Sequence, residues 1–77
     1  MTIQVKFFGL LADVTGKSEM ELQNMIDTDS LRQKVIAVFP NLSNYKFVVA
    51  VNKKIVNRNE KLQTGDVAAF LPPFGGG

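Results

Sequence analysis

The sequence predicts an α+β fold: a mixed sheet, formed in the chain order β-β-α-β-β-β, with one main helix packed on one face. Polar and apolar residues alternate near the N-terminus, a helical repeat ends at a proline in the middle, and β-branched apolar runs fill the C-terminal half. Strands on both sides of a single helix are typical of a sheet with one covered face. The 77 residues suit one domain, which we expect over residues 1–71, followed by a flexible tail of residues 72–77.

The N-terminal segment predicts two strands. Ile3, Val5 and Phe7 alternate with polar residues, which is the period of a half-buried strand. A turn or helical loop is expected over 12–16, and residues 19–22 alternate again. A hairpin is the simplest arrangement of these two strands.

The middle of the chain predicts the main helix. Thr28, Asp29 and Ser30 are all suitable N-cap residues, and Gln33 stands where a capping-box partner of Ser30 would lie. Pro40 ends the helix, because proline has no N–H to donate and restricts the residue before it. The expected buried stripe consists of Leu31, Val35, Val38 and Phe39.

The C-terminal half predicts three strands and their turns. The expected segments, in order, are a strand over 47–51, a turn at Asn52-Lys53, a short strand over 54–56, a turn over 62–66 and a strand over 67–71 that Pro72-Pro73 stops. We expect the last strand to pair with the first, so that the C-terminus extends beyond the sheet.

The residue content argues against an independent enzyme. Cysteine and histidine are absent, which excludes disulfides, thiolate metal sites, cysteine nucleophiles and imidazole acid-base chemistry. The seven carboxylates are scattered, so we expect the chain itself to bind no metal and no cofactor. The N-terminus has no signal-peptide pattern, no apolar run approaches a membrane span, and a net charge of +2 is too small to indicate nucleic acid. A cytoplasmic location is expected.

The last residues, Leu71-Pro72-Pro73-Phe74-Gly75-Gly76-Gly77, are the most informative segment. The prolines keep the chain extended, and the six residues after Leu71 can reach roughly 20 Å. Glycines without side chains can enter a narrow channel, and a terminal glycine carboxylate is unhindered. A frayed chain end or a cloning remnant is the alternative interpretation.

Several motifs together resemble one family. Phe7-Phe8, Ala50-Val51-Asn52, Gly65-Asp66, Ala69-Phe70-Leu71-Pro72-Pro73 and the final Gly76-Gly77 are similar to the small subunit of molybdopterin synthase, the MoaD type of sulfur carrier. The motifs span almost the whole chain in the family's order. The resemblance implies a ubiquitin-like β-grasp fold. Phe74 and Gly75 depart from the residues that usually precede the final two glycines.

The resemblance also implies a mechanism and partners. The Gly77 carboxylate would be adenylated by an E1-like activating enzyme that uses ATP, and a sulfur donor protein would convert it to a thiocarboxylate. The tail, with Pro73, Phe74, Gly75 and Gly76, would enter a channel of the large synthase subunit and give its sulfur to cyclic pyranopterin monophosphate. The chain would be the non-catalytic, sulfur-donating subunit of a heterotetramer, with neither nucleic acid nor membrane as a partner.

A docking patch is expected beside the tail. If Ile3, Val5 and Phe7 face the helix, Phe8 points the opposite way, and Leu71 shares its face. Ile55 joins them from the neighbouring hairpin, and three large exposed apolar residues near the root of the tail favour docking over chance. In the family, the matching residues pack on the large subunit.

A basic stretch lies beside the same hairpin. Lys53, Lys54, Arg58 and Lys61 most often indicate a solvated face, and complementarity to an acidic partner is the alternative.

Three other functions remain open from the sequence. They are a thiamine-pathway sulfur carrier, a ubiquitin-like modifier that forms isopeptide bonds, and a plain binding module with an inert tail. Pro72-Pro73 favours the molybdopterin branch, since the thiamine carriers usually lack that pair.

Overall fold

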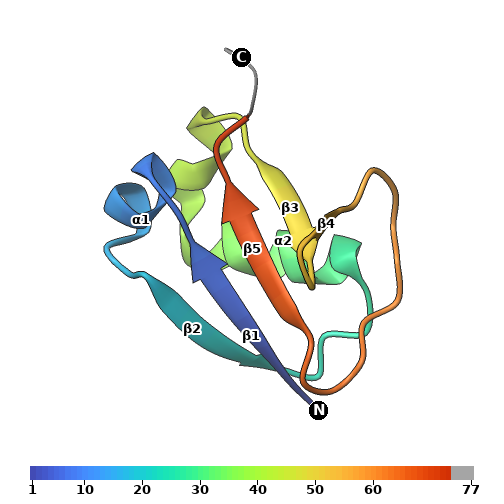
Figure 1. Cartoon of the computed structure of the whole chain (residues 1–77). Helices are drawn as coiled ribbons and strands as arrows, with labels where there is room; N and C mark the ends of the chain where they lie inside the picture. The colour runs from blue at the N-terminus through green and yellow to red at the C-terminus, as the bar shows by residue number, and fades with distance from the viewer. Residues whose placement is uncertain (74–77) are drawn as a thin grey trace.

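The computed structural model describes residues 1–73, which form a five-stranded sheet in the order β2-β1-β5-β3-β4 (Figure 1). The elements are β1 (Thr2–Phe7), α1 (Leu10–Thr15), β2 (Glu19–Gln23), α2 (Thr28–Val38), the 3-10 helix η1 (Pro40–Asn44), β3 (Val48–Val51), β4 (Lys54–Ile55) and β5 (Val67–Leu71). The predicted mixed sheet with one main helix is confirmed.

The first and last strands are central neighbours. β1 and β5 run parallel, in a register that pairs Gln4 with Val67 and Phe7 with Phe70. The neighbouring pairs, β1 with β2, β3 with β5 and β3 with β4, are antiparallel. Because β1 and β5 run in the same direction, both end at the same edge of the sheet, near α1 and η1 (Figure 1). The predicted pairing of the last strand with the first is confirmed.

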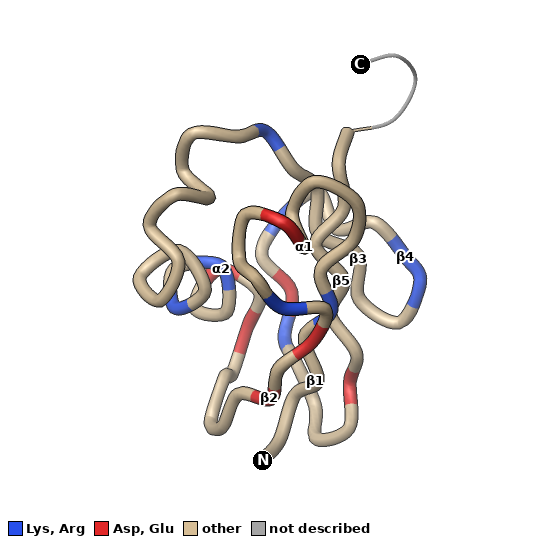
Figure 2. Tube along the Cα trace, turned by 90° about the vertical axis from the view of Figure 1, so that its left-hand side faces the viewer, with Lys and Arg blue, Asp and Glu red and all other residues tan. Residues whose placement is uncertain are grey.

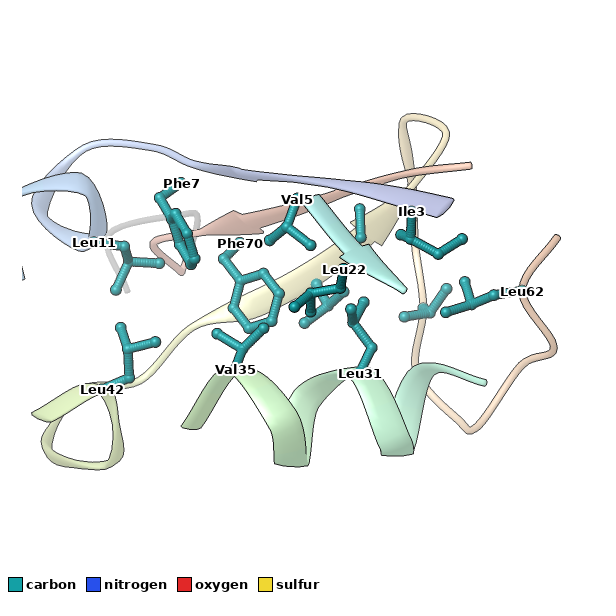
Figure 3. Close-up of a cluster of buried hydrophobic side chains, with 13 residues drawn as sticks. Ile3, Val5, Phe7, Leu11, Leu22, Leu31, Val35, Leu42, Leu62 and Phe70 are labelled. Atoms are coloured by element: carbon teal, nitrogen blue, oxygen red, sulfur yellow. The ribbon is translucent and has the colours of Figure 1, made fainter. Parts of the chain in front are cut away.

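The core lies between the sheet and α2 (Figure 3). Every second residue of β1 and of β5 is buried, and α2 contributes Leu31 and Val35, both fully buried. Burying one such aliphatic side chain stabilises the fold by about 1.5–3 kcal/mol. The core cluster consists of Ile3, Val5, Phe7, Leu11, Leu22, Leu31, Val35, Leu42, Val49, Val56, Leu62, Ala68 and Phe70.

The start of α2 differs from the prediction. Asp27, in extended backbone, is the N-cap, and its carboxylate accepts a hydrogen bond of 2.8 Å from the N–H of Ser30. The expected cap residues 28–30 are therefore already helical. Asn59, from a loop far along the chain, also accepts a 2.9 Å hydrogen bond from the N–H of Asp29. The helix begins earlier than predicted because a carboxylate and a distant amide satisfy its free N–H groups.

The end of α2 is partly as predicted. The helix stops at Val38, Phe39 is its C-cap, and Pro40 begins η1. Phe39 packs against the core, and the centroids of the Phe39 and Phe7 rings are 5.7 Å apart. Placing Val38 in the core was wrong: its side chain is 43% exposed. Val38 is the last helical residue, and the chain turns into η1 just after it, so the buried stripe ends one turn earlier.

Two short helices were not predicted as such. α1 begins at Leu10, before the expected turn or helical loop over 12–16, and ends at Thr15. Its C-cap is Gly16, which lies in the left-handed region with φ of 72°. A helix of six residues is unstable alone, so α1 depends on burying Leu11. η1 depends in the same way on Leu42. None of the helices within residues 1–73 has both the length and the apolar content needed to cross a membrane.

Candidate functional site

The face of the sheet opposite α2 carries the residues predicted to dock a partner. Phe8 follows β1, and its N–H donates a 3.1 Å hydrogen bond to the carbonyl of Phe70, which keeps it alongside β5. Because Phe7 points into the core, its neighbour Phe8 points to the open face. The side chain of Phe8 is 45% exposed.

Ile55 and Leu71 reach the same face from two other strands. Ile55 pairs with Ala50, and Ala50 pairs with Ala69 on β5. The three predicted docking residues, Phe8, Ile55 and Leu71, all line one groove of about 600 Å³. The structure thus brings them together, while their part in docking stays a prediction.

The groove exists because small residues occupy the middle of the open face. Ala50 and Ala69 are directly paired on the central strands β3 and β5. Their methyl groups leave a depression between the larger side chains of Phe8, Leu71 and Ile55. An apolar depression edged by large apolar side chains is the kind of surface that protein partners cover.

Hydrogen bonds fix the hairpin turn at one end of the groove. Asn52 donates from its side-chain amide to Asp66 over 2.9 Å and accepts from the N–H of Val67 over 3.0 Å. The backbone N–H of Asn52 also donates to the carbonyl of Val67 over 2.8 Å. The two predicted turns, at residues 52–53 and 62–66, are therefore bonded to each other, and the β3–β4 turn is anchored to the start of β5.

The basic residues divide between two surfaces. Lys53 lines the apolar groove, whereas Lys54 and Lys61 line a separate polar depression, and Arg58 lines neither. Figure 2 marks Lys and Arg in blue, and one blue segment lies on the loop beside β4. Lys6 also lines the groove, although it is not among the predicted site residues. Its signal was present, since the two-residue period that sends Phe8 outward sends Lys6 outward as well.

Gly9 packs against the root of the tail. It has φ of 56°, and a Cβ built on it would lie 3.1 Å from Cγ of Pro72. Glycine therefore allows the end of β1 and the first tail residue to approach closely. Pro73 is the last residue described, and the predicted site residues Phe74, Gly75, Gly76 and Gly77 lie outside the described residues.

Metal-binding side chains do not gather within residues 1–73. In this part of the chain no group of three or more Asp or Glu residues is placed to hold a metal ion. The groove on the open face offers apolar contact and the charges of Lys6 and Lys53.

Comparison with known proteins identifies the family. A family model described as the ThiS family matches residues 5–77. The chain belongs to the ThiS family. This ThiS-family chain is 34% identical to the molybdopterin synthase sulfur carrier subunit of Chlamydomonas reinhardtii, over 83 aligned residues and the full length of both proteins.

Solved structures show the same fold. The ThiS-family chain resembles a putative molybdopterin-converting factor subunit 1 from Pyrococcus furiosus, with a TM-score of 0.87, 22% identity, and coverage of 96% of this chain and 99% of that one. It also resembles a chain of the Helicobacter pylori complex of molybdopterin-converting factor subunits 1 and 2, with a TM-score of 0.74, 26% identity and full coverage of both chains. The fold is the ubiquitin-like β-grasp that the sequence predicted.

Proposed function

We propose that this chain is the sulfur carrier subunit of a molybdopterin synthase. One structural observation carries the proposal: the apolar groove and the root of the tail are continuous. Leu71 is the last residue of β5 and lines the groove, and Pro72 follows it directly. A partner that covers the groove is therefore presented with the tail. The family and the name of the Chlamydomonas relative support this function over an inert binding module.

The chemistry belongs to the end of the chain. The proposal takes Gly77 as the last residue of the mature protein. Its carboxylate attacks the α-phosphate of ATP in an activating enzyme, and pyrophosphate leaves. A sulfide equivalent from a sulfur donor protein then displaces AMP and leaves a thiocarboxylate. Adenylation is needed because a free carboxylate is a poor electrophile, whereas a mixed anhydride has a good leaving group.

The large synthase subunit is the proposed acceptor of this sulfur. The groove formed by Phe8, Ile55 and Leu71 docks on it, and Pro73, Phe74, Gly75 and Gly76 thread toward its catalytic groups, where sulfur passes to the pyranopterin. The Helicobacter relative, whose solved structure is a complex of subunits 1 and 2, supports a large-subunit partner. The folded domain acts as a rigid handle for the reactive terminus.

Intact mass spectrometry tests the proposed chemistry. The chain is co-expressed with an E1-like activating enzyme and a sulfur donor, then weighed intact. We expect the mass gain for one oxygen replaced by sulfur at the C-terminus. An unchanged mass would favour an inert module, and covalent ladders of higher mass would favour a protein modifier.

A binding comparison tests the branch of the pathway. Pull-down with a molybdopterin synthase large subunit is compared with pull-down by a thiazole synthase. Retention by the thiazole synthase alone would replace the proposal with the thiamine-pathway carrier.

A substitution on the groove tests the docking face. Phe8→Lys should weaken binding to the large subunit at least about tenfold, because a charge replaces an aromatic side chain that the partner would bury on binding. The free energy of unfolding should change by less than about 1 kcal/mol, since Phe8 is already half exposed. Ile26→Lys is the matched control, because Ile26 is 65% exposed and does not line the groove. Equal binding by both variants would assign docking to another face.

A further inference from the structure

Two lysines border the apolar groove. Lys6 and Lys53 belong to its lining, and among the residues that the structure describes no carboxylate does. Lys6 is paired with Ala69 on β5, so it lies in the strand row that continues through Ala50 to Ile55. Lys53 lies in the turn between β3 and β4, at the end of that row away from β1. The groove is thus apolar in its middle and basic on two sides.

Two carboxylates, Glu19 and Asp66, lie near the groove but do not line it. Glu19 is paired with Lys6 across β1 and β2, on the side away from β5, and Glu19 and Lys6 both line a polar depression beside the groove. Asp66 accepts hydrogen bonds from the amide of Asn52, over 2.9 Å, and from the N–H of Gln63, over 2.8 Å, which hold its carboxylate between the two turns. Lys53 therefore lies in a groove lining without a carboxylate among the described residues, whereas Lys6 borders the groove on one side and Glu19 on the other.

We propose, building on the function above, that the groove receives an apolar ridge of the large subunit edged by carboxylates, and that Lys6 and Lys53 select this partner by charge. Charges at the rim of an interface act mainly on the association rate and on discrimination between partners, while the apolar centre holds the complex together. The two lysines determine specificity, and Phe8, Ile55 and Leu71 provide the adhesion.

Other occupants fit the groove less well. A second copy of this chain in a two-fold pairing would place the same basic patch against itself, and like charges repel. Single-stranded nucleic acid binds to successive aromatic platforms, and within the described chain Phe8 is the one aromatic residue of the lining. A partner protein with an apolar centre and an acidic rim satisfies both parts of the surface.

Stopped-flow association with the purified large subunit encoded in the same genome tests the proposal. At low ionic strength, Lys53→Glu and the double variant Lys6→Gln/Lys53→Glu should bind about tenfold or more slowly than the wild type. The dependence of the wild-type rate on salt should weaken in both variants. Lys6→Gln is used because a glutamate at position 6 would face Glu19 and repel it.

Lys34→Glu is the matched control. It changes the net charge by the same amount as Lys53→Glu, but Lys34 is exposed on α2, which covers the opposite face of the sheet. Its association rate should stay within about twofold of the wild-type rate, since screening at about 10 Å limits distant charges at 0.1 M salt. A carboxylate-to-lysine scan of the large subunit should also contain at least one variant that restores fast binding of Lys53→Glu.

The outcomes separate the two proposals. If the wild type binds and Phe8→Lys weakens binding, but Lys53→Glu behaves like Lys34→Glu, the charge selection is overturned and the carrier function stands. If the wild type does not bind the large subunit, both are overturned. Lysine-dependent binding of a labelled oligonucleotide, or lysine-dependent self-association in sedimentation, would overturn the charge selection in favour of that occupant.

Discussion

Two residues of the β3–β4 turn, Asn52 and Lys53, have left-handed backbone conformations that are unfavourable for non-glycine residues. Asn52 and Lys53 have φ values of 50° and 73°, as a two-residue hairpin of type I′ requires. Asn52 tolerates this conformation and bonds to Asp66 and Val67, but lysine gains nothing comparable. Lysine at position 53 is therefore an unfavourable residue for the turn, and its exposed side chain lines the groove.

Replacing Lys53 by glycine should stabilise the domain. The left-handed conformation destabilises the folded state by about 1–2 kcal/mol at a non-glycine residue, and glycine removes this cost. Glycine also has more conformational entropy to lose on folding, which offsets about 0.5–1 kcal/mol of the gain. We expect Lys53→Gly to raise the free energy of unfolding by about 0.5–1 kcal/mol in urea titrations. Lys54→Gly, in β4, should lower it by a similar amount. A loss of stability in Lys53→Gly would mean that the side chain stabilises the turn.

The two-residue period predicted which face each strand residue occupies, but not which residues meet across the sheet. Phe8 and Leu71 were placed on the open face by alternation and by the expected pairing of β1 with β5, and they line one groove. The bond between Asn52 and Asp66 joins residues 14 positions apart, and alternation carries no such information. Register and side-chain bonds between turns come from the assembled sheet.

At the scale of elements, the start of α2 is fixed by a distant loop. Asp27 accepts from the N–H of Ser30 and from the amide of Asn59, and the hydroxyl of Thr28 accepts from the N–H of Glu60. The predicted cap residues were Thr28, Asp29 and Ser30, and local preference alone did not show that Asp27, just before them, caps the helix. The loop around Asn59 selects Asp27 as the cap. The bounds of α1 and η1 were likewise beyond prediction, since tertiary contacts hold such short helices.

The cap should give the domain a specific acid sensitivity. Hydrogen bonds from Ser30, and then from Asn59, hold the pKa of Asp27 below its ordinary value. Because the folded-state pKa is lowered, the carboxylate's contribution is fully present above the unfolded pKa of about 3.9 and is lost as pH falls through the lower folded-state pKa. Asp27→Asn keeps a cap acceptor that does not titrate.

Urea midpoints of the wild type and Asp27→Asn, measured between pH 7 and pH 2, test this. We expect the wild type to be more stable at pH 7 and the difference to shrink below pH ~4. Because other carboxylates titrate equally in both proteins, the difference isolates Asp27. A difference that stays constant with pH would show that the carboxylate is not preferentially stabilised in the folded state.

At the scale of the whole molecule, the fold separates stability from the proposed reactivity. The residues of the core cluster all fall within positions 3–70 of the sequence. β5 (Val67–Leu71) then runs from the core to the edge of the sheet beside Phe8. The sequence predicts a folded domain followed by a separate tail, because a strand, a proline pair and a glycine run follow one another along the chain. The identity of a docking partner could not follow from the sequence pattern, since it depends on a surface assembled from β1, β3, β4, β5 and one turn.

Changes at the C-terminus should therefore abolish sulfur transfer and leave the domain folded. Deleting Gly77 shortens the reach by about 3.3–3.6 Å, which withdraws the carboxylate from a site built for bond formation. Adding residues after Gly77 replaces the carboxylate with an amide. In both variants the free energy of unfolding should change by less than about 0.5 kcal/mol, because no core residue is touched.

Intact mass after incubation with the activating enzyme, ATP and sulfur donor reads out both variants, and neither should gain sulfur. A protease-cleavable extension that leaves Gly77 as the new terminus provides the control, because the folded domain is identical before and after cleavage. Cleavage should restore sulfur loading in the same sample. If the uncleaved protein loads sulfur at the wild-type rate, the reacting group is not the terminal carboxylate, and the chemistry must be sought on the domain itself.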